Sequence, residues 1–420
     1  MGARHAAGTH LDAGLASRRP DDVGQHLHDA QARCLRSGGA APDVPYPDRG
    51  RRNAVTVPMT VEQVIVRQVS LPLAEPYKLS LLTMREFDPF LVEVRDAEGR
   101  SGFGEALIVP GYTSETVEGT WRLCCTLAET IVGRSLSDAA GIARQAVPQG
   151  TGAASAVLAA LDLLAGHDVL TPVEDLVVPL LAPLNSDDPA ELAQEIERKI
   201  AQGFRTLKVK VGFDWRDDLR RVQTVQALTA QRATLRLDAN QGFDADDGSA
   251  FASRLDPQGI ELFEQPCHMD DWQANAAVAR VSKVPVMLDE SIYDVSAIDR
   301  AADIDGVGFV KLKLKKIGSV DMLLDALAHI RHRGMTPVLG DGVSLEVGCW
   351  AEACVAARAI DNAGEMNGFL KSRTRLFENP LPFADGAIRI PAGYAPRVDR
   401  EILASCTRRA SGFHARPAMT

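Results

Sequence analysis

The chain has 420 residues, of which 45% are hydrophobic and 24% charged, and its formal net charge is −10. This composition excludes a wholly disordered or collagen-like chain and allows two domains. A general nucleic-acid surface is excluded too, because binding phosphates needs an excess of Lys and Arg. No run approaches the roughly 20 apolar residues of a membrane span, and no secretory signal is recognisable, so we expect a cytoplasmic homo-oligomer that acts on a small molecule and binds no membrane. The seven cysteines are scattered, which argues against a disulfide framework or a zinc site.

The first part of the chain changes character at Met59. Residues 1–58 show no helical or strand period, and we expect them to be disordered or a spurious extension. In residues 59–176, strand-like alternation and a hairpin near Asp96 are followed by Ala- and Leu-rich helices. We therefore expect an α+β capping domain in this range.

Residues 177–385 repeat one unit, a short apolar strand followed by an amphipathic helix. Several residues mark where these helices are expected to begin or end: Pro189 suits a first turn, Gly203 suits a C-terminal end, and Ser319 suits an N-cap. Eight such strands predict a (β/α)8 barrel; an open doubly wound sheet is the alternative, although no Gly-rich nucleotide loop follows any strand. We expect residues 386–406 to return to the cap and residues 407–420 to be a disordered tail.

Charged residues stand at the ends of successive barrel strands, 24 to 28 residues apart: Lys208 and Lys210, Asp238, Glu264, Asp289, and Lys311 and Lys313. In a closed barrel these side chains meet at one mouth, where catalytic groups of this fold collect. Three converging carboxylates repel one another unless a cation neutralises them, and all-oxygen ligation favours a hard divalent ion such as magnesium. The sequence thus predicts a metal site.

The lysines suggest proton transfer. Lys208 and Lys210 share one face of a strand, and two neighbouring ammonium groups should lower the pKa of one of them and make a general base available. Lys313 lies at the end of a strand four positions along the barrel from the strand that carries Lys210. A substrate carbon held between Lys210 and Lys313 would meet a proton-transfer group on each face.

Five elements resemble the enolase superfamily, in particular its muconate-lactonizing (muconate cycloisomerase) subgroup: Lys208-Val209-Lys210, Asp238-Ala239-Asn240, Glu264-Gln265-Pro266, Asp289-Glu290-Ser291, and the stretch from Lys313 to Gly318. The resemblance runs from about residue 59 to 402. It implies an α+β cap over a modified barrel, one Mg²⁺ (with Mn²⁺ as a substitute) that binds a substrate carboxylate, and a lysine that removes the α-proton.

Carried over by position, Asp238, Glu264 and Asp289 resemble the metal ligands, with Asn240 behind them. Lys210 resembles the base on one face and Lys313 the acid or base on the other, while Lys208 resembles the residue that holds the carboxylate. Lys311 also faces the barrel side and is the alternative to Lys313.

Substrate contacts follow less directly. The resemblance implies contacts from Tyr112 and residues 81–84 of the cap, and Glu346 either orients Lys313 or is a helix-start acid. The eighth strand is expected to place Lys371, Arg373 and Arg375 on one face, where dipeptide epimerases have an Asp-x-Asp pair. In another register, Glu378 aligns with the second aspartate of that pair. This predicts a substrate with a second anionic or polar group.

The expected function is a magnesium-dependent isomerase that abstracts the proton α to a carboxylate, by cycloisomerisation, racemisation or epimerisation. A dehydratase with the same first step is the alternative. A non-catalytic binding protein for an organic anion is disfavoured, because it needs no base on either face of its ligand.

Overall fold

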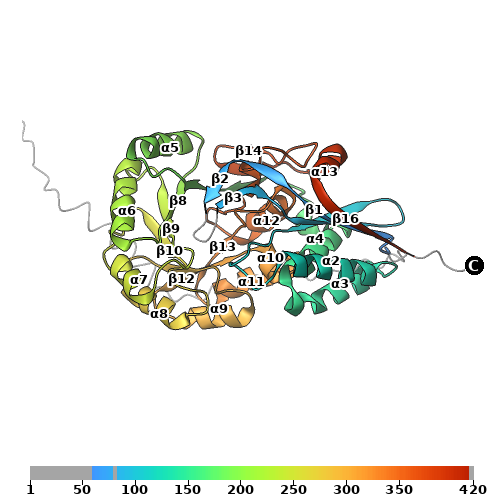
Figure 1. Ribbon diagram of the computed structural model, residues 1–420, viewed down its shortest axis with the longest axis horizontal. Helices are drawn as coiled ribbons and strands as arrows, with labels where there is room; N and C mark the ends of the chain where they lie inside the picture. Colours follow the sequence, from blue (N-terminus) through green and yellow to red (C-terminus); the bar gives the residue numbers. More distant parts are fainter. Residues whose placement is uncertain (1–58, 79–82, 416–420) are drawn as a thin grey trace, which may run out of the picture. The chain divides into compact units, whose positions relative to one another are not determined.

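The computed structural model describes residues 59–78 and 83–415, which fold into a cap and a barrel (Figure 1). Residues 1–58, and with them the expectation of a disordered extension, lie outside this part. The cap contains a four-stranded antiparallel sheet in the order β16-β1-β4-β5, formed by β16 (Thr407–His414), β1 (Gln63–Val69), β4 (Phe90–Arg95) and β5 (Ser101–Ala106). A separate hairpin joins β2 (Leu71–Lys78) to β3 (Thr83–Phe87).

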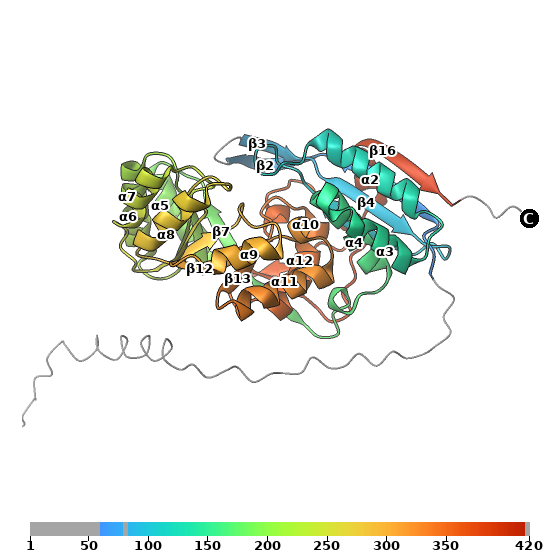
Figure 2. The ribbon, with the colours of Figure 1, turned by 90° about the horizontal axis from the view of Figure 1, so that it is seen from below.

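The turn between β4 and β5 forms the expected hairpin, because Asp96 Oδ1 accepts the backbone N–H groups of Glu98 (3.0 Å) and Arg100 (2.9 Å). The cap helices are α2 (Val117–Ile131), α3 (Leu136–Gln145) and α4 (Thr151–Leu164). Glycines in β5 let α4 approach closely: a Cβ on Gly104 would stand 1.9 Å from the Ala156 carbonyl oxygen. Helix α4 thus packs closely against the cap sheet, and Figure 2 shows it beside β4.

The second domain has seven parallel strands in the order β13-β12-β11-β10-β9-β8-β7. They are β7 (Leu181–Leu184), β8 (Thr206–Lys210), β9 (Thr234–Asp238), β10 (Ile260–Glu264), β11 (Val286–Leu288), β12 (Val307–Leu312) and β13 (Thr336–Leu339). Helices follow one another around them (Figure 1): α5 (Pro189–Ala201), α6 (Trp215–Thr229), α7 (Ala245–Ala252), α8 (Trp272–Val281), α9 (Val295–Ala302), α10 (Leu314–Ile317), α11 (Val320–His332) and α12 (Glu346–Ala359). The expected cap at Ser319 is present, since its side chain accepts from Met322 N–H.

The eighth position of the barrel holds an irregular segment. Gly364 hydrogen-bonds the backbone of Pro179 and Leu181 on one side, and Glu365 N–H donates to the Leu339 carbonyl (3.0 Å) on the other. Beyond it the chain turns into a 3₁₀ helix, η3 (Gly368–Leu370). The expected alternating strand over residues 370–375 is therefore wrong, and the barrel is closed by the few backbone hydrogen bonds of residues 364–365.

Two boundaries also differ from expectation. The first predicted strand divides at residue 180: β6 (Leu176–Pro179) pairs with β15 (Ala387–Ile390), which pairs in turn with β14 (Phe383–Ala384). After α13 (Arg400–Cys406), residues 407–414 form β16 and pair with β1 of the cap. The prediction of a disordered tail over 407–420 is wrong for these eight residues, because backbone pairing needs no run of apolar side chains.

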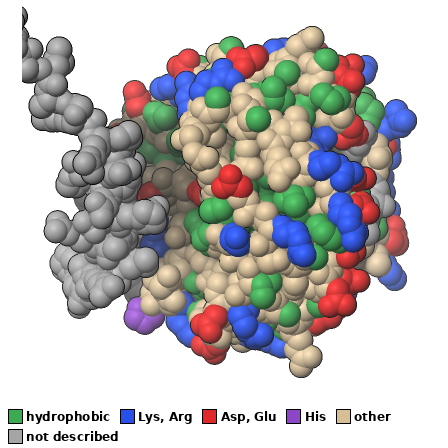
Figure 3. Space-filling view, turned by 90° about the vertical axis from the view of Figure 1, so that its left-hand side faces the viewer, with side chains coloured by type: hydrophobic (Ala, Val, Ile, Leu, Met, Phe, Trp, Pro, Cys, Tyr) green, Lys and Arg blue, Asp and Glu red, His purple; other side chains and the backbone are tan. Residues whose placement is uncertain are grey.

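Within the described ranges, no helix has the length and apolar character needed to cross a membrane. On the face shown in Figure 3, Lys and Arg side chains are interspersed with Asp and Glu.

Candidate active site

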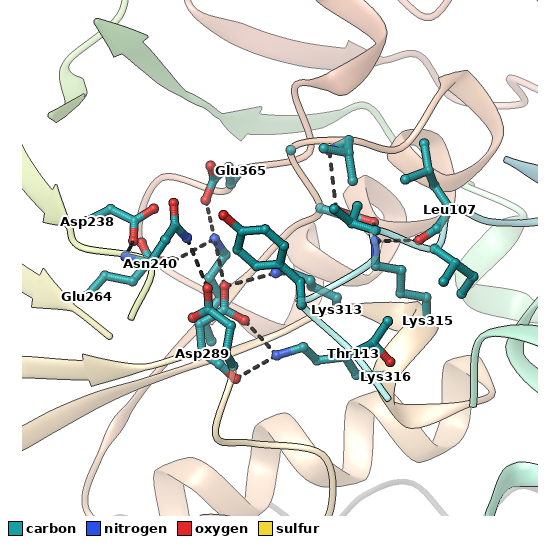
Figure 4. A pocket seen from close by; sticks show the side chains of 18 of the residues that line it. Leu107, Thr113, Asp238, Asn240, Glu264, Asp289, Lys313, Lys315, Lys316 and Glu365 are labelled. Carbon is teal, nitrogen blue, oxygen red and sulfur yellow. Dashed lines mark hydrogen bonds and ion pairs between the residues drawn. The ribbon is translucent and has the colours of Figure 1, made fainter. Parts of the chain in front are cut away.

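One pocket at the carboxyl ends of the barrel strands collects the charged side chains that the sequence singles out (Figure 4). Its lining includes all seven: Lys208, Lys210, Asp238, Glu264, Asp289, Lys311 and Lys313. They come from β8 to β12 or from the residue directly after a strand. The period of the βα units thus placed every one of them correctly.

The three carboxylates are buried and paired with lysines. Lys208 Nζ lies 2.8 Å from Asp238 Oδ2 and 2.9 Å from Glu264 Oε2. Lys210 Nζ lies 2.5 Å from Asp238 Oδ2. Burial alone would raise the pKa of Asp238, but the ammonium groups of Lys208 and Lys210 outweigh it and lower the pKa to about 2. Asp238 therefore stays ionised at neutral pH.

The two carboxylates further along the sheet differ from each other. Burial and the neighbouring charge of Asp238 raise the pKa of Glu264. The pKa of Asp289 lies well below its usual value despite burial, because Lys313, Lys316 and Lys311 surround it. Lys313 Nζ stands 2.9 Å from Asp289 Oδ2 and Lys316 Nζ 2.6 Å from Oδ1.

The pKa values of the lysines correct one expectation. Burial would lower the pKa of Lys210, and Lys208 lowers it further, but the adjacent Asp238 raises it above its usual value. Burial likewise lowers the pKa of Lys313, and Asp289 raises it well above the usual value. The expectation that Lys208 or Lys210 has a lowered pKa is thus wrong, because each ammonium group lies beside a carboxylate that outweighs the neighbouring ammonium group.

Lys311 and Lys313 occupy different environments. The Lys311 side chain is 3% exposed and its Nζ contacts Glu264 (3.1 Å), Asp289 (3.5 Å) and Glu365. The Lys313 side chain is 17% exposed, and its Nζ pairs with Asp289 alone among the described residues. Lys313 is therefore the more accessible of the two from the pocket, and Lys311 is held within an ion-pair network.

The donor set fits a hard divalent cation. Asp238, Glu264 and Asp289 present carboxylate oxygens from three consecutive strand ends, as Mg²⁺ prefers. Glu264 Oε2 is buried and has no hydrogen-bond partner in the described part of the chain, although Lys208 lies within ion-pair distance. In the same part no three acids converge as a ligand cluster, and the carboxylates are paired with lysine ammonium groups. This oxygen, which accepts no hydrogen bond from the described residues, is where a cation would be accommodated.

The sequence reasoning missed Glu365, which lies at the eighth position of the barrel. Its carboxylate accepts hydrogen bonds from Lys208 (2.9 and 3.0 Å) and from Lys311. These ammonium groups hold the pKa of Glu365 well below the usual value despite burial. The spacing Glu365-x-Asn367 was the available signal, since an acid and an amide two positions apart resemble the Asp-x-Asp pair, which was sought six residues further along the chain, from Lys371.

Several predicted substrate contacts lie elsewhere. Arg373 is exposed and donates to the Ala74 carbonyl (3.4 Å), and Arg375 donates to the Phe369 carbonyl (2.6 Å). Lys371 Nζ donates to Gly342 O (2.5 Å) and Asn367 Oδ1 (2.6 Å) behind the lining. These three residues do not line the pocket, because the chain turns at η3 where a strand was expected.

Two glutamates are also displaced from their predicted roles. Glu346 is the first residue of α12, and its carboxylate accepts the backbone N–H groups of Leu376, Phe377 (3.1 Å) and Leu381 (3.3 Å). It neither lines the pocket nor contacts Lys313, so the helix-start interpretation of its position is the correct one. Glu378 pairs with Arg397 (3.4 Å) away from the pocket.

The cap covers the pocket with a largely apolar wall. Tyr77, Leu107, Ile108, Val109, Tyr112 and Thr113 line it. Barrel side chains hold this wall in place: Lys315 Nζ donates to Leu107 O (3.0 Å), and Tyr293 Oη donates to Tyr112 O (3.0 Å). Tyr112 therefore lies at the pocket as expected. Of residues 81–84, Leu81 and Leu82 fall outside the described part, and Met84 is not part of the lining.

Comparisons with known proteins agree with this arrangement. Residues 61–179 match the mandelate racemase / muconate lactonizing enzyme N-terminal domain, and residues 191–396 match the enolase C-terminal domain-like family. The chain is 30% identical over 274 residues to the hydrophobic dipeptide epimerase of Enterococcus faecalis, covering 62% of this chain and 77% of that protein. It is 26% identical to the N-succinyl-L-Arg/Lys racemase of Bacillus cereus, covering 72% and 83%.

A solved structure, that of the Enterococcus faecalis dipeptide epimerase complexed with Mg and the dipeptide L-Leu-L-Tyr, is also similar. It superposes with a TM-score of 0.72 at 26% identity, over 80% of this chain and 98% of that one. The chain belongs to the mandelate racemase/muconate lactonizing enzyme family of the enolase superfamily. It is an enzyme of this family, in the isomerase class of these relatives.

Proposed function

We propose that the protein is a magnesium-dependent isomerase that moves the proton α to the carboxylate of a small organic acid, by racemisation or epimerisation. The observation that carries this proposal is the placement of Lys210 and Lys313, which line one pocket from strands four positions apart in the sheet. A carbon between them meets a proton-transfer group on each face.

In this proposal Asp238, Glu264 and Asp289 would hold Mg²⁺. The all-oxygen donor set supports it, as does the Glu264 oxygen that accepts no hydrogen bond from the described residues. The bound ion would supply positive charge that neutralises the substrate carboxylate and makes its α-proton more acidic. Magnesium is preferred to manganese, because the similar Enterococcus faecalis structure is complexed with Mg.

Proton transfer requires one lysine to be neutral and the other protonated. Lys210 would be the proton acceptor, because a metal ion held by Asp238 would weaken the carboxylate charge that raises the pKa of Lys210. Lys313 donates a proton to the opposite face from its position beside Asp289. Lys208 is nearly fully buried and contributes positive charge where the substrate carboxylate would lie.

The proposal extends to the class of substrate. The Glu365 carboxylate would attract a free α-ammonium group of a substrate. Lys208 and Lys311 already neutralise its charge, however. A third cation there would meet two buried ammonium groups. We therefore favour an acid without a free ammonium, such as an N-acylated amino acid, over a dipeptide. The pocket shows no support for the expected role of Arg373 in binding a second anion.

Elimination is the second candidate, and one observation favours it. Lys315 lines the pocket beside Lys313, 2.7 Å from Asp341 Oδ2. An ammonium group at this place could donate a proton to a β-leaving group, which would make the enzyme a dehydratase. A substrate screen should therefore include β-hydroxy acids.

The testing experiment is α-proton exchange in deuterated buffer, followed by proton NMR over a panel of carboxylic acids with Mg²⁺ present. We expect at least one acid to lose its α-proton signal, with inversion of configuration in the product. Absence of exchange from a panel that includes N-acyl amino acids, dipeptides and hydroxy acids would argue for a binding protein.

A cytoplasmic location also belongs to this proposal and is supported by the free thiols of all six described cysteines. That the protein forms a homo-oligomer stays a prediction.

A further inference from the structure

Glu290 is a buried carboxylate in the pocket for which the proposed reaction has no role. It follows Asp289 directly, is 2% exposed, and lines the pocket. Its Oε1 accepts a hydrogen bond from Asn240 Nδ2 (3.0 Å), while Oε2 has no hydrogen-bond partner among the described residues. The Asn240 amide is thus the only donor that the described chain gives this carboxylate.

The other end of the Asn240 amide faces the base. Asn240 Oδ1 accepts a hydrogen bond from Lys210 Nζ. A carboxylate only accepts hydrogen bonds and an ammonium only donates them, so a single orientation of the amide satisfies both neighbours. Glu290 therefore determines which end of the Asn240 amide is turned toward Lys210.

Both ends of this chain of contacts rest on rigid backbone. Gln265 Oε1 accepts the backbone N–H groups of Asp289 (3.0 Å) and Ser291 (3.2 Å), which fixes the segment that carries Glu290. Asn240 N–H donates to Asp238 Oδ1 (2.9 Å), and Asn240 adopts a left-handed φ of 41°. Neither residue can shift without breaking these contacts.

We propose that Glu290 is a positioning residue that acts through Asn240 to hold Lys210 in place for proton transfer on one face of the substrate carbon. Lys313 Nζ donates to Asp289 Oδ2 (2.9 Å), and Glu290 acts on Lys313 through its charge, which raises the pKa of this lysine. We therefore expect proton transfer on the opposite face to depend much less on the contact between Glu290 and Asn240. The inference rests on the proposed function and adds that the two lysines are positioned by different residues, Lys210 by Asn240 and Lys313 by Asp289.

The test compares the two faces within one protein. With a substrate found in the exchange screen, the R and S forms are incubated separately in deuterated buffer, and the initial loss of each α-proton is measured for wild type and variants. Abstraction by Lys210 should fall about 100-fold in Glu290→Ala, as expected for a displaced catalytic group, whereas abstraction by Lys313 should stay within about threefold. Lys210→Ala and Lys313→Ala identify which form reports on which lysine.

Two further variants separate positioning from general damage. Glu290→Gln keeps an oxygen that accepts from Asn240 and should restore most of the lost rate. Asn240→Ala should impair the same face, and Glu290→Ala should add little to it, because both changes break one chain of contacts. Equal loss on both faces, no loss in Glu290→Ala, or additive losses would overturn the proposal.

A second measurement does not depend on turnover. Limited acetylation followed by peptide mass spectrometry reports the labelling rate of each lysine, and Glu290→Ala should change the rate severalfold at Lys210 and less at Lys313, on which Glu290 acts through its charge. An unchanged Lys210 rate would overturn the positioning role. If wild type exchanges no substrate yet Lys210 labelling responds, the proposed function fails and the contact between Glu290, Asn240 and Lys210 stands.

Discussion

The carboxylate of Glu105, on strand β5 of the cap, accepts a 2.6 Å hydrogen bond from the backbone N–H of Leu345, the residue that precedes helix α12 of the barrel. It also accepts the N–H of Gly348 at 3.0 Å. Leu345 itself provides no side-chain cap, so a residue of one domain caps a helix of the other. This contact joins the cap to the segment that follows β13.

Replacing Glu105 should therefore destabilise the enzyme. Glu105→Ala leaves two buried N–H groups at the start of α12 without an acceptor, and we expect a loss of about 2 kcal/mol in the free energy of unfolding. Denaturant unfolding measures it. Glu129→Ala, at an exposed position in α2, is the matched control and should change stability little; equal effects of the two would contradict the capping role.

The same contact predicts a pH dependence of stability. Burial raises the pKa of Glu105 to about 7, although the two N–H groups oppose the shift. The folded state therefore binds a proton more tightly than the unfolded state, whose glutamate has a pKa near 4.5. The contribution of Glu105 is fully present below this lower value and is lost as the pH rises toward 7. Unfolding curves from pH 5 to 8 should show a shallower decline in Glu105→Gln, and an unchanged slope would contradict the assignment.

Much of the site follows from the sequence because βα units repeat. The spacing of Asp238, Glu264 and Asp289 fixes their common position at strand ends, whatever the details of packing. Partners are a different matter: the ion pairs that raise the pKa of Lys210 depend on side-chain distances across the barrel, which no local pattern contains. The sequence therefore predicted which groups meet and misjudged their protonation.

The missed elements have a common cause, which is weak local signal. Glu365 belongs to a segment with too few backbone pairs to form a strand, so the expected register of the eighth strand slipped toward Lys371. Strand β16 alternates between half-buried and exposed side chains along Thr407–His414, and it has no apolar run from which a strand could be predicted. In both cases pairing with distant strands, rather than side-chain pattern, determines the structure.

Metal binding should depend on the three carboxylates. Asp238→Asn removes a charge from the donor set, and we expect Mg²⁺ affinity to fall at least 10-fold and α-proton exchange to be lost, as chelation should also cause. Isothermal titration calorimetry measures the binding. Asp246→Asn, an exposed position in α7, is the control. Wild-type exchange in chelated enzyme would contradict the metal assignment.

Replacing Lys210 or Lys313 should leave α-proton exchange of a different enantiomer in each variant. Lys210→Ala and Lys313→Ala should each reduce racemisation by 1,000-fold or more, while each variant still exchanges the α-proton of the one enantiomer that faces its remaining lysine. Chiral chromatography and deuterium incorporation distinguish the two activities. Lys283→Ala, an exposed lysine, should behave as wild type. Loss in Lys311→Ala combined with full activity in Lys313→Ala would assign the second base to Lys311.

Substrate choice should follow the charge state of Glu365. Because Lys208 and Lys311 hold this carboxylate as a buried ion pair, a free α-ammonium group would have to displace one lysine to reach it, which leaves that lysine without a partner. We expect kcat/KM for N-acylated amino acids to exceed that for dipeptides with the same α-carbon by 10-fold or more.

Lys311→Met removes one ammonium group and leaves the Glu365 carboxylate free to pair with a substrate ammonium, so the ratio of the two kcat/KM values should fall by about 10-fold. Lys311→Gln provides a second variant, and circular dichroism with Mg²⁺ titration verifies that both fold. Faster turnover of dipeptides by wild type, or a preference that neither variant changes, would show that Glu365 does not exclude the ammonium group.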